Sequence, residues 1–225
     1  MKNKSLKRAL LATIFSLACS PATYADSGDI GVAVKGSTLG LGGEVTVGIS
    51  PSINARAGCS GFHYNGHTTQ SDIKYNYKLD LESFPVLLDW YPFDSGFRLS
   101  SGVVINNNNV TATGTSQTSY NIGGTPYSPA ELGSLSGKVG FKHVAPYAGI
   151  GWGNAVGEDS GLSITVDLGI MFQGRPDVSL TAEGGTLVNT TPFKTNLANE
   201  INDVKNKIND LKYYPVISLG LAYKF

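Results

Sequence analysis

The chain has 225 residues, of which 41% are hydrophobic and only 15% are charged, and it is rich in glycine (28 residues) and tyrosine (11 residues). No apolar run approaches the roughly 18 residues of a transmembrane helix, so a protein that crosses a membrane by helices is excluded. The composition is typical of a β-rich domain with closely packed strands and interfacial aromatic residues, and the length predicts one domain.

A cleavable secretory signal is predicted at 1–25. Four basic residues precede an apolar stretch at 10–18, and a small-residue cleavage site follows at 23–25. Its removal leaves a single domain at 26–225 with thirteen basic and seventeen acidic residues, a net charge of −4. Such a domain, without a basic stripe, is not expected to bind nucleic acid. Cys59 remains as its single cysteine, which excludes an internal disulfide.

Apolar and polar residues alternate along most of the domain with the period of a β-strand. In the last stretch Ile217, Leu219 and Leu221 face one way, while small and polar residues face the other. In a membrane barrel the apolar row meets lipid and the small, polar row fills the interior, which is the inverse of a soluble protein. Segments with this pattern lie at 30–35, 39–49, 53–60, 75–90, 97–103, 135–141, 145–153, 162–173, 178–182 and 215–225.

The alternation changes phase inside 75–90. Up to Leu81 the odd-numbered residues are apolar, whereas from Phe84 onward the even-numbered residues are apolar. A shift of one residue is the mark of a β-bulge, and Pro85 supports it because proline cannot donate to a central ladder. We therefore predict a bulge near Ser83.

One segment has the period of a helix. Its apolar residues are spaced four, three, four and three apart, at Leu197, Ile201, Val204, Ile208 and Leu211. Thr191 followed by Pro192 supplies a cap and a proline at the first helical position. A short amphipathic helix is therefore predicted at 197–211, with its apolar face on the barrel rim or the lipid interface rather than on a partner.

The predicted fold is all-β: an antiparallel up-and-down transmembrane β-barrel of about 8–10 strands, with the short helix in its last extracellular loop. Such barrels have short turns on the periplasmic side, where both termini lie, and long loops outside. The turns assigned to the periplasmic side are at Ser50, Tyr91, Lys142-His143 and Gln173. The loops assigned to the outside are 65–72, 106–133, 154–161 and 184–212. This assignment favours ten strands over eight.

A family resemblance follows from these features together. The secretory signal, the alternating strands, the run LGLGGEVTVGISPSINARAG at 39–58 and the terminal Tyr223-Lys224-Phe225 resemble the OmpW-like and opacity-type outer-membrane β-barrels of Gram-negative bacteria. The resemblance implies an outer-membrane location and contact with outer-membrane lipid. It also implies that Tyr223 and Phe225 form the signal that the barrel assembly machinery recognises.

Charged residues on the inner row are candidates for a network inside the barrel. Glu44 and Arg56 are expected to be diagonal neighbours across the turn at Ser50. In a barrel of about eight strands side chains nearly fill the interior, so mixed charges would pair into a plug, whereas ten strands would leave room for a narrow polar pore. The plug is favoured. The predicted interior charges are Glu44, Arg56, Lys78, Asp80, Glu82, Asp89, Arg98, Lys138 and Asp167.

Catalytic and metal sites find little support in the sequence. His63 and His67 lie in strand and loop without cysteine or carboxylate close in sequence, and a zinc site needs three or four converging ligands. A hydrolase would need a converging His–Ser–acid set, and the chain has no Gly-x-Ser-x-Gly elbow. The glycine run at 40–43 lacks the lysine and helix of a phosphate-binding loop. Neither a metal nor a cofactor is predicted.

The expected function is therefore an outer-membrane barrel with a structural or narrow-channel role and no catalytic activity. One alternative is a surface adhesin that acts through 106–133 and 184–212. A less favoured alternative is a lipid-modifying enzyme that depends on His63, His67 or His143.

Overall fold

The computed structural model describes residues 27–70, 73–93, 95–116, 119–157 and 161–225, so the predicted signal at 1–25 lies outside the described residues. Eight antiparallel strands close into a barrel, and the pairing of β4 with β5 completes the circle. The predicted all-β antiparallel barrel is confirmed. Its strands are β1 (Ile30–Ser37), β2 (Gly40–Ser50), β3 (Ile53–Gln70), β4 (Ile73–Trp90), β5 (Phe97–Asn106), β10 (Val144–Trp152), β11 (Gly161–Met171) and β13 (Tyr214–Lys224).

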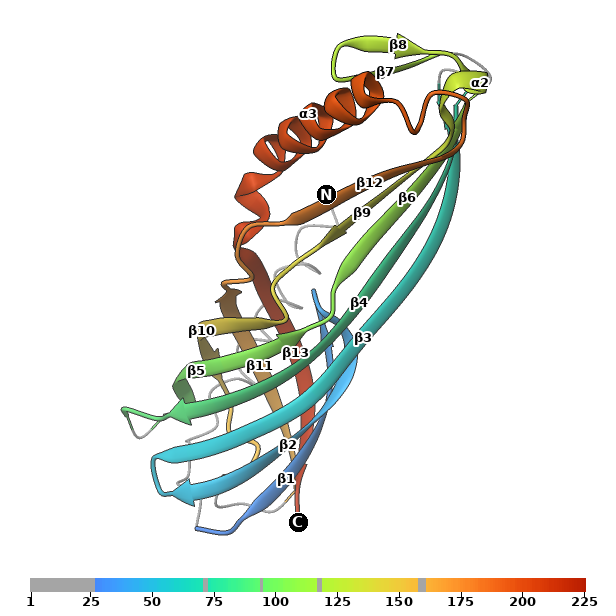
Figure 1. The fold of residues 1–225 in the computed structure, drawn as a ribbon. Coiled ribbons are helices and arrows are strands. Elements are labelled where there is room, and N and C mark those ends of the chain that lie inside the picture. The colour runs from blue at the N-terminus through green and yellow to red at the C-terminus, as the bar shows by residue number, and fades with distance from the viewer. Residues whose placement is uncertain (1–26, 71–72, 94, 117–118, 158–160) are drawn as a thin grey trace, which may run out of the picture.

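A tall sheet rises from one end of the barrel, opposite the base at which β1 begins and β13 ends (Figure 1). This outer sheet combines the upper halves of β3 and β4 with β6 (Asn109–Ser116), β9 (Gly133–Gly140) and β12 (Asp177–Gly184), in the order β12–β9–β6–β4–β3. Strand β4 connects the two parts, because its residues 83–90 pair with β5 in the barrel and its residues 73–80 pair with β6 in the outer sheet.

The preference for ten barrel strands is wrong. Lys142-His143 and Gln173 are bends within long strands rather than turns, since β9 continues into β10 and β11 continues into β12. Residues 154–157 and Gly161 lie at the base and not outside, because Trp152 pairs with Phe97 and Gly161 pairs with Lys224, and the rest of the predicted loop 154–161 lies outside the described residues.

Two further predicted loops are largely ordered structure. Strands β3 and β4 extend through most of 65–72. The stretch 106–133 contains β6, the hairpin of β7 (Tyr120–Ile122) with β8 (Thr125–Tyr127), and the short helix α2 (Pro129–Leu132). The described parts of these two stretches therefore form the outer sheet and the elements packed on it rather than irregular loops.

The bulge predicted near Ser83 is absent from the pairing of β3 with β4. Ala57 pairs with Val86 and Ser60 pairs with Ser83, so three residues on one strand match three on the other. Instead, the apolar residues of β4 face outward in the barrel and inward in the outer sheet. In the barrel the inner face of β4 carries Asp89 and Ser83, and the same face carries Leu81 in the outer sheet. Because the inner face of the outer sheet packs against other elements, its apolar residues point inward there.

This inner face is apolar across the whole outer sheet. Residues that stand opposite each other in paired strands share a face. One row crosses all five strands and consists of Tyr64, Leu79, Val110, Val139 and Val178. At the distal end of the sheet, the end farthest from the barrel, other elements cover this face.

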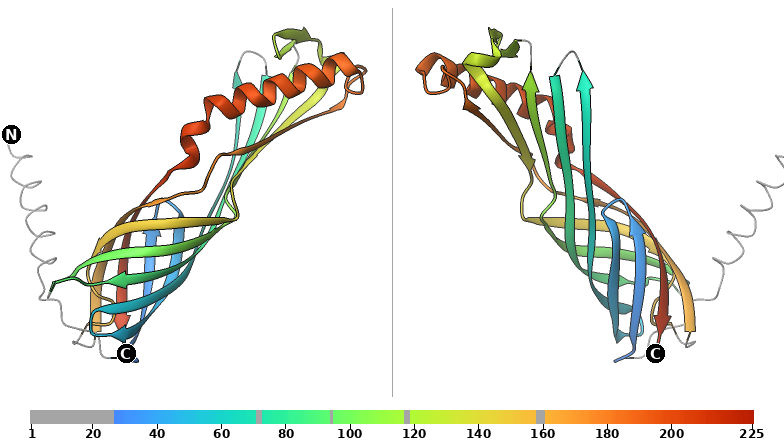
Figure 2. Two further views of the ribbon diagram at one scale, coloured as in Figure 1. Left: turned by 60° about the vertical axis from the view of Figure 1, so that its left-hand side comes forward. Right: turned by 90° about the vertical axis from the view of Figure 1, so that its right-hand side faces the viewer.

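The predicted helix is confirmed as α3 (Thr191–Lys207), followed by the 3-10 helix η1 (Asn209–Lys212). Its cap is Thr190 rather than the predicted Thr191, which is the first helical residue, and Pro192 follows in the first turn. Figure 2 shows α3 descending from the distal end of the outer sheet to the rim of the barrel, where η1 leads into β13. Within the described residues no helix has both the length and the apolar character needed to cross a membrane.

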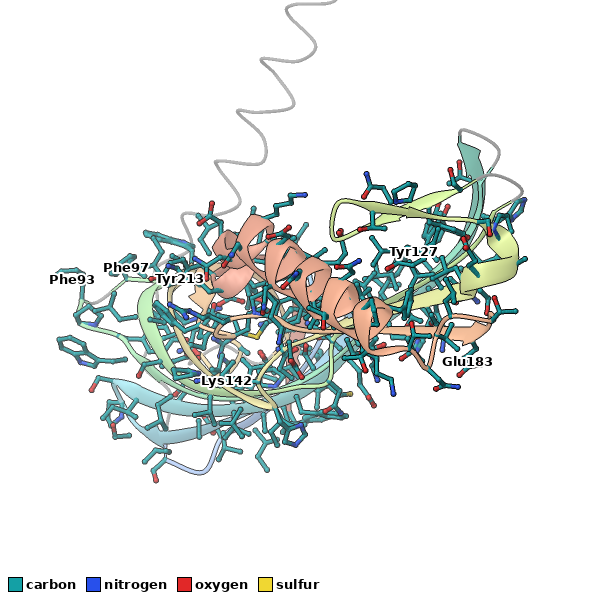
Figure 3. The ribbon with its side chains drawn as sticks, turned by 45° about the horizontal axis from the view of Figure 1, so that its top comes forward. Phe93, Phe97, Tyr127, Lys142, Glu183 and Tyr213 are labelled. Atoms are coloured by element: carbon teal, nitrogen blue, oxygen red, sulfur yellow. The ribbon has the colours of Figure 1, made fainter. Side chains whose placement is uncertain are left out.

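The first half of α3 packs on the outer sheet rather than on the barrel rim. Phe193 is 1% exposed and its ring meets that of Tyr127 edge-on at 5.0 Å. The distal core around this pair consists of Tyr120, Ile122, Tyr127, Leu132 and Phe193, with Leu135, Ala182, Leu187, Val188 and Leu197 packed against it. In Figure 3 the labelled Tyr127 and Glu183 lie at this distal end, away from Phe93 and Phe97.

Helix α2 closes the distal core with a local hydrogen-bonded cap. The Ser128 backbone N–H and hydroxyl both donate to Glu131 Oε2, each at 2.8 Å. These two hydrogen bonds lower the pKa of Glu131 below its ordinary value. The cap holds α2, and with it the buried Leu132, against the sheet.

Candidate functional site

A formally neutral cluster of three cations and three carboxylates lies inside the barrel. Each member comes from a different strand, so the cluster ties most of the barrel wall together. The members are Lys35 on β1, Glu44 on β2, Arg56 on β3, Asp89 on β4, Arg98 on β5 and Asp167 on β11. All six are buried.

Arg56 lies at the centre of the cluster and contacts all three carboxylates. Its Nη1 lies 3.1 Å from Glu44 Oε1, and its Nη2 lies 3.3 Å from Asp167 Oδ1. Its Nε pairs with Asp89 Oδ2. The fixed fork of the guanidinium group can serve several acceptors at once, which a lysine ammonium could not do in the same geometry.

The other two cations complete the charge balance. Lys35 Nζ lies 2.9 Å from both Glu44 Oε1 and Asp167 Oδ2. Arg98 Nη2 lies 2.6 Å from Asp167 Oδ1, and its Nη1 donates to the Gly153 carbonyl at the base. Buried charges are tolerated when they are paired and hydrogen-bonded, and this network meets that condition.

Hydroxyl groups satisfy remaining carboxylate oxygens. Ser100 Oγ donates to Asp89 Oδ1 at 2.5 Å, and Ser218 Oγ donates to Asp167 Oδ2 at 2.9 Å. Asp167 therefore accepts from three cations and one hydroxyl. The charges of the six members are therefore balanced within the cluster.

An apolar layer covers the charges on the side of the outer sheet. It consists of Leu39, Leu87, Val104, Ala145, Tyr147, Met171 and Val216. A cavity of about 40 Å³ lies where the two layers meet, lined by Lys35 and Asp167 from one layer and by Leu87 and Tyr147 from the other. That volume holds a few water molecules at most.

Residues 153–157 close the interior from the base. The Val156 side chain is fully buried, and Asn154 Oδ1 accepts a hydrogen bond from Asn54 Nδ2 at 3.0 Å. A Cβ on Gly31 would collide with the Ala155 carbonyl, so a glycine is needed for this segment to fold inward. The interior therefore has three layers: an inward-folded base segment, the charge cluster and the apolar layer.

Five of the nine charges expected in the interior meet in this cluster: Glu44, Arg56, Asp89, Arg98 and Asp167. The prediction that the other four lie in the interior is wrong, because they lie on the outward face of the outer sheet. These four are Lys78, Asp80, Glu82 and Lys138. Lys78 Nζ pairs there with Asp80 Oδ2 at 3.0 Å.

Lys35 is a member of the cluster that the sequence analysis missed. It follows Gly31 and Ala33 on the small-residue row of β1. The sequence signal that could have identified Lys35 is its position on the face of small residues, while Val32 and Val34 lie on the other face of the same strand.

The proposed assembly residues lie at the base end of β13. Tyr223 and Phe225 both face outward, and their rings meet edge-on at 5.3 Å. Their recognition by an assembly machinery stays a prediction.

The histidines do not converge. His63 Nε2 lies 3.7 Å from Asp80 Oδ1 on the outward face of the outer sheet, and His67 lies exposed farther along β3. His143 lies at the bend between β9 and β10. Among the described residues no group of three or more histidine, cysteine or acidic side chains could hold a metal ion.

Comparison with solved structures shows the same architecture elsewhere. The crystal structure of CarO2 from Acinetobacter baumannii matches with a TM-score of 0.57 at 20% identity, over 89% of this chain and 100% of that one. CarO from the same organism matches with a TM-score of 0.56 at 17% identity, over 87% of this chain and 97% of that one. Both likenesses are of fold. No protein-family model matches the chain. No curated protein matches it either.

Proposed function

We propose that the chain is a Gram-negative outer-membrane β-barrel protein with a sealed interior, which acts as a structural platform for its outer sheet. Its location is supported by an outward apolar row along every barrel strand, with side chains such as Leu41 and Leu162 each 73% exposed. Such a row suits contact with outer-membrane lipid. Exposed aromatic residues border the band, with Phe172 and Tyr213 at the rim and Trp90, Phe93, Trp152, Tyr223 and Phe225 at the base.

The sealed interior is the observation that carries the structural role. An ion that crosses the barrel would have to displace the apolar layer, break the neutral charge cluster and unfold 153–157 from the base. An eight-stranded barrel is just wide enough for its own side chains. The sealed barrel favours a plug over the narrow pore.

Contact with the barrel assembly machinery is part of the same proposal. The terminal strand β13 pairs with both β1 and β11, so it closes the barrel. Tyr223 and Phe225 at its end form an exposed aromatic pair, which remains available to a partner before closure.

The refolded mature protein is expected to be silent in a planar bilayer. Single-channel recording at 1 M salt should show no discrete steps, because the three interior layers leave no continuous water path. Heat-modifiable mobility on a gel serves as the control that the same preparation contains a folded barrel. Discrete steps whose size changes with Glu44→Gln or Arg56→Gln would contradict the sealed interior and establish the narrow pore.

A second candidate function is capture of an extended polypeptide segment by the outer sheet. Above Gly61, the outer edge of β3 pairs with no strand in the described part of the chain, because β2 ends at the pair of Leu41 with Gly61. On the inner face beside this edge Phe62 and Tyr64 are 44% and 49% exposed. A free edge offers backbone groups and the aromatic residues offer an apolar surface, which together suit an added strand with alternating apolar residues.

Replacing Phe62 and Tyr64 with lysine is expected to reduce binding of an extended peptide with alternating apolar residues to the refolded protein more than tenfold. Aromatic residues in such contacts contribute disproportionately to affinity, and lysine at these two positions removes the apolar surface. The control is His63→Lys with His67→Lys on the opposite face of the same strand, which should leave binding largely intact. Equal binding by wild type and the Phe62 and Tyr64 variant would refute this candidate.

A further inference from the structure

A polar cavity of about 410 Å³ lies between the end of α3 and the bend that separates β11 from β12. It is lined by Arg175 and Pro176 from the bend and by Asn202, Lys205, Asn206 and Asn209 from the end of α3 and the start of η1. The descent of α3 onto the rim brings these segments together (Figure 2).

The lining is rich in hydrogen-bond donors. Residues 202, 205, 206 and 209 have the spacing of one helix face, so their side chains point the same way. They present one ammonium group and three amides toward the Arg175 guanidinium. An oxyanion with several acceptor oxygens matches this donor set, and a guanidinium group can bind a phosphate through two parallel hydrogen bonds.

Both cations are accessible to a ligand. Arg175 is exposed and forms no ion pair with any residue in the described part of the chain. Lys205 Nζ lies 3.3 Å from Asp177 Oδ1, but the Asp177 side chain is 87% exposed. An exposed ion pair of this kind contributes little stability, so an anion can displace the carboxylate at small cost.

Further charges surround the cavity. Lys142 lies against the same bend, since a Cβ on Gly174 would be 2.8 Å from its Cδ. Lys212 lies over the ring of Tyr213 at 5.2 Å. Asp203 and Asp210 are the acidic residues on α3 and η1 next to the lining, and both are exposed.

The height of the cavity relative to the apolar band suggests the source of the anion. Phe172 directly follows β11 and Tyr213 directly precedes β13; both are exposed, and their rings meet edge-on at 5.8 Å. The outward row is apolar below them, and Arg175, Lys142 and Lys212 follow directly above. In outer-membrane barrels an aromatic girdle marks the level of the lipid headgroups.

We propose that this cavity binds the phosphoryl group of a phosphorylated lipid headgroup in the outer leaflet. The inference rests on the proposed outer-membrane location. Arg175 and Lys205 neutralise the phosphoryl charge, and the three amides donate to or accept from oxygens of the headgroup. Such a contact would hold α3 and the outer sheet at a fixed height above the membrane.

The test compares lipid binding by the wild type with that of an Arg175→Gln, Lys205→Gln double variant. Refolded protein in phosphatidylcholine vesicles containing lipid A would be analysed by native mass spectrometry. Removing two basic residues that contact an anionic headgroup is expected to weaken lipid A binding about tenfold to thirtyfold. The matched control, Lys138→Gln with Lys194→Gln, removes the same charge at exposed sites away from the cavity and should bind like the wild type.

Asp177→Asn provides a test in the opposite direction. Without the competing carboxylate, lipid A should bind about threefold more tightly. Equal binding by the wild type and the Arg175 and Lys205 variant, or an equal loss in the control variant, would overturn the site. Saturation by inorganic phosphate without any binding of lipid A would overturn its assignment to a lipid. Failure of the wild type to insert into vesicles, seen as loss of heat-modifiable mobility, would instead count against the outer-membrane location.

Discussion

Replacing Arg56 with methionine is expected to lower the free energy of unfolding by about 3–5 kcal/mol. The methionine fills a similar volume but leaves Glu44, Asp89 and Asp167 facing one another without their central cation. Breaking a buried ion pair by removing one partner costs far more than the pair itself contributes, because the remaining charge stays buried. Here three carboxylates lose the same partner.

Urea unfolding of the protein in vesicles, followed by tryptophan fluorescence, measures this loss. Lys78→Met is the matched control, because the Lys78 side chain is 56% exposed and its removal should change stability by less than about 0.5 kcal/mol. Arg56→Lys should fall between the two, since it keeps the charge but loses the forked geometry. If Arg56→Met and Lys78→Met were equally stable, the cluster would not contribute to holding the barrel together.

Replacing Phe193 with alanine is expected to detach α3 from the outer sheet and leave the barrel intact. Phe193 is 1% exposed and fills the distal core beside Tyr127. Truncation of a fully buried phenylalanine costs about 3–5 kcal/mol. The barrel strands share no residue of this core, so the loss should appear as local opening of the outer elements and not as global unfolding.

Amide hydrogen exchange resolves the two regions. Amides of α3 should exchange at least a hundredfold faster in Phe193→Ala, since about 3 kcal/mol corresponds to more than two powers of ten, while those of β11 and β13 keep their protection. Lys194→Ala alters the exposed neighbouring residue and should leave exchange unchanged. Faster exchange in the barrel strands as well would show that the distal core and the barrel unfold as one unit.

Alternation was sufficient to predict the barrel, because each barrel strand carries a clear outward apolar row. It failed where strands leave the barrel. In β4 the odd-numbered residues face inward in both parts of the strand, at Asp89 in the barrel and at Leu81 in the outer sheet. The inner face is polar in the barrel and apolar in the outer sheet. In the sequence, this change of polarity gives the same pattern as a β-bulge, which inserts one residue.

The same ambiguity explains the misplaced charges. The assumed bulge moved Lys78, Asp80 and Glu82 to the inner face, whereas the uninterrupted pairing leaves them outward. Asp89 and Asp167 were placed inside because they alternate with the apolar residues of their strands, and this rule holds in the barrel, where both lie. The cavity at Arg175 and Lys205 could not be predicted from the sequence, because it depends on how α3 folds back toward the bend at 172–176.

In the proposed outer-membrane setting, the reversal of polarity along β3 and β4 limits how deeply the protein can lie in the bilayer. Sliding the molecule into the membrane by two residues along β4 would draw Glu82 and then Asp80 into hydrocarbon. Sliding it out by two residues would lift Phe84 and Val86 into water. Both displacements are opposed, the first by the cost of burying an acidic side chain in hydrocarbon and the second by the loss of apolar burial. The change from polar to apolar outward residues at Ser83 therefore fixes the depth of the proposed membrane-embedded barrel within one uninterrupted strand.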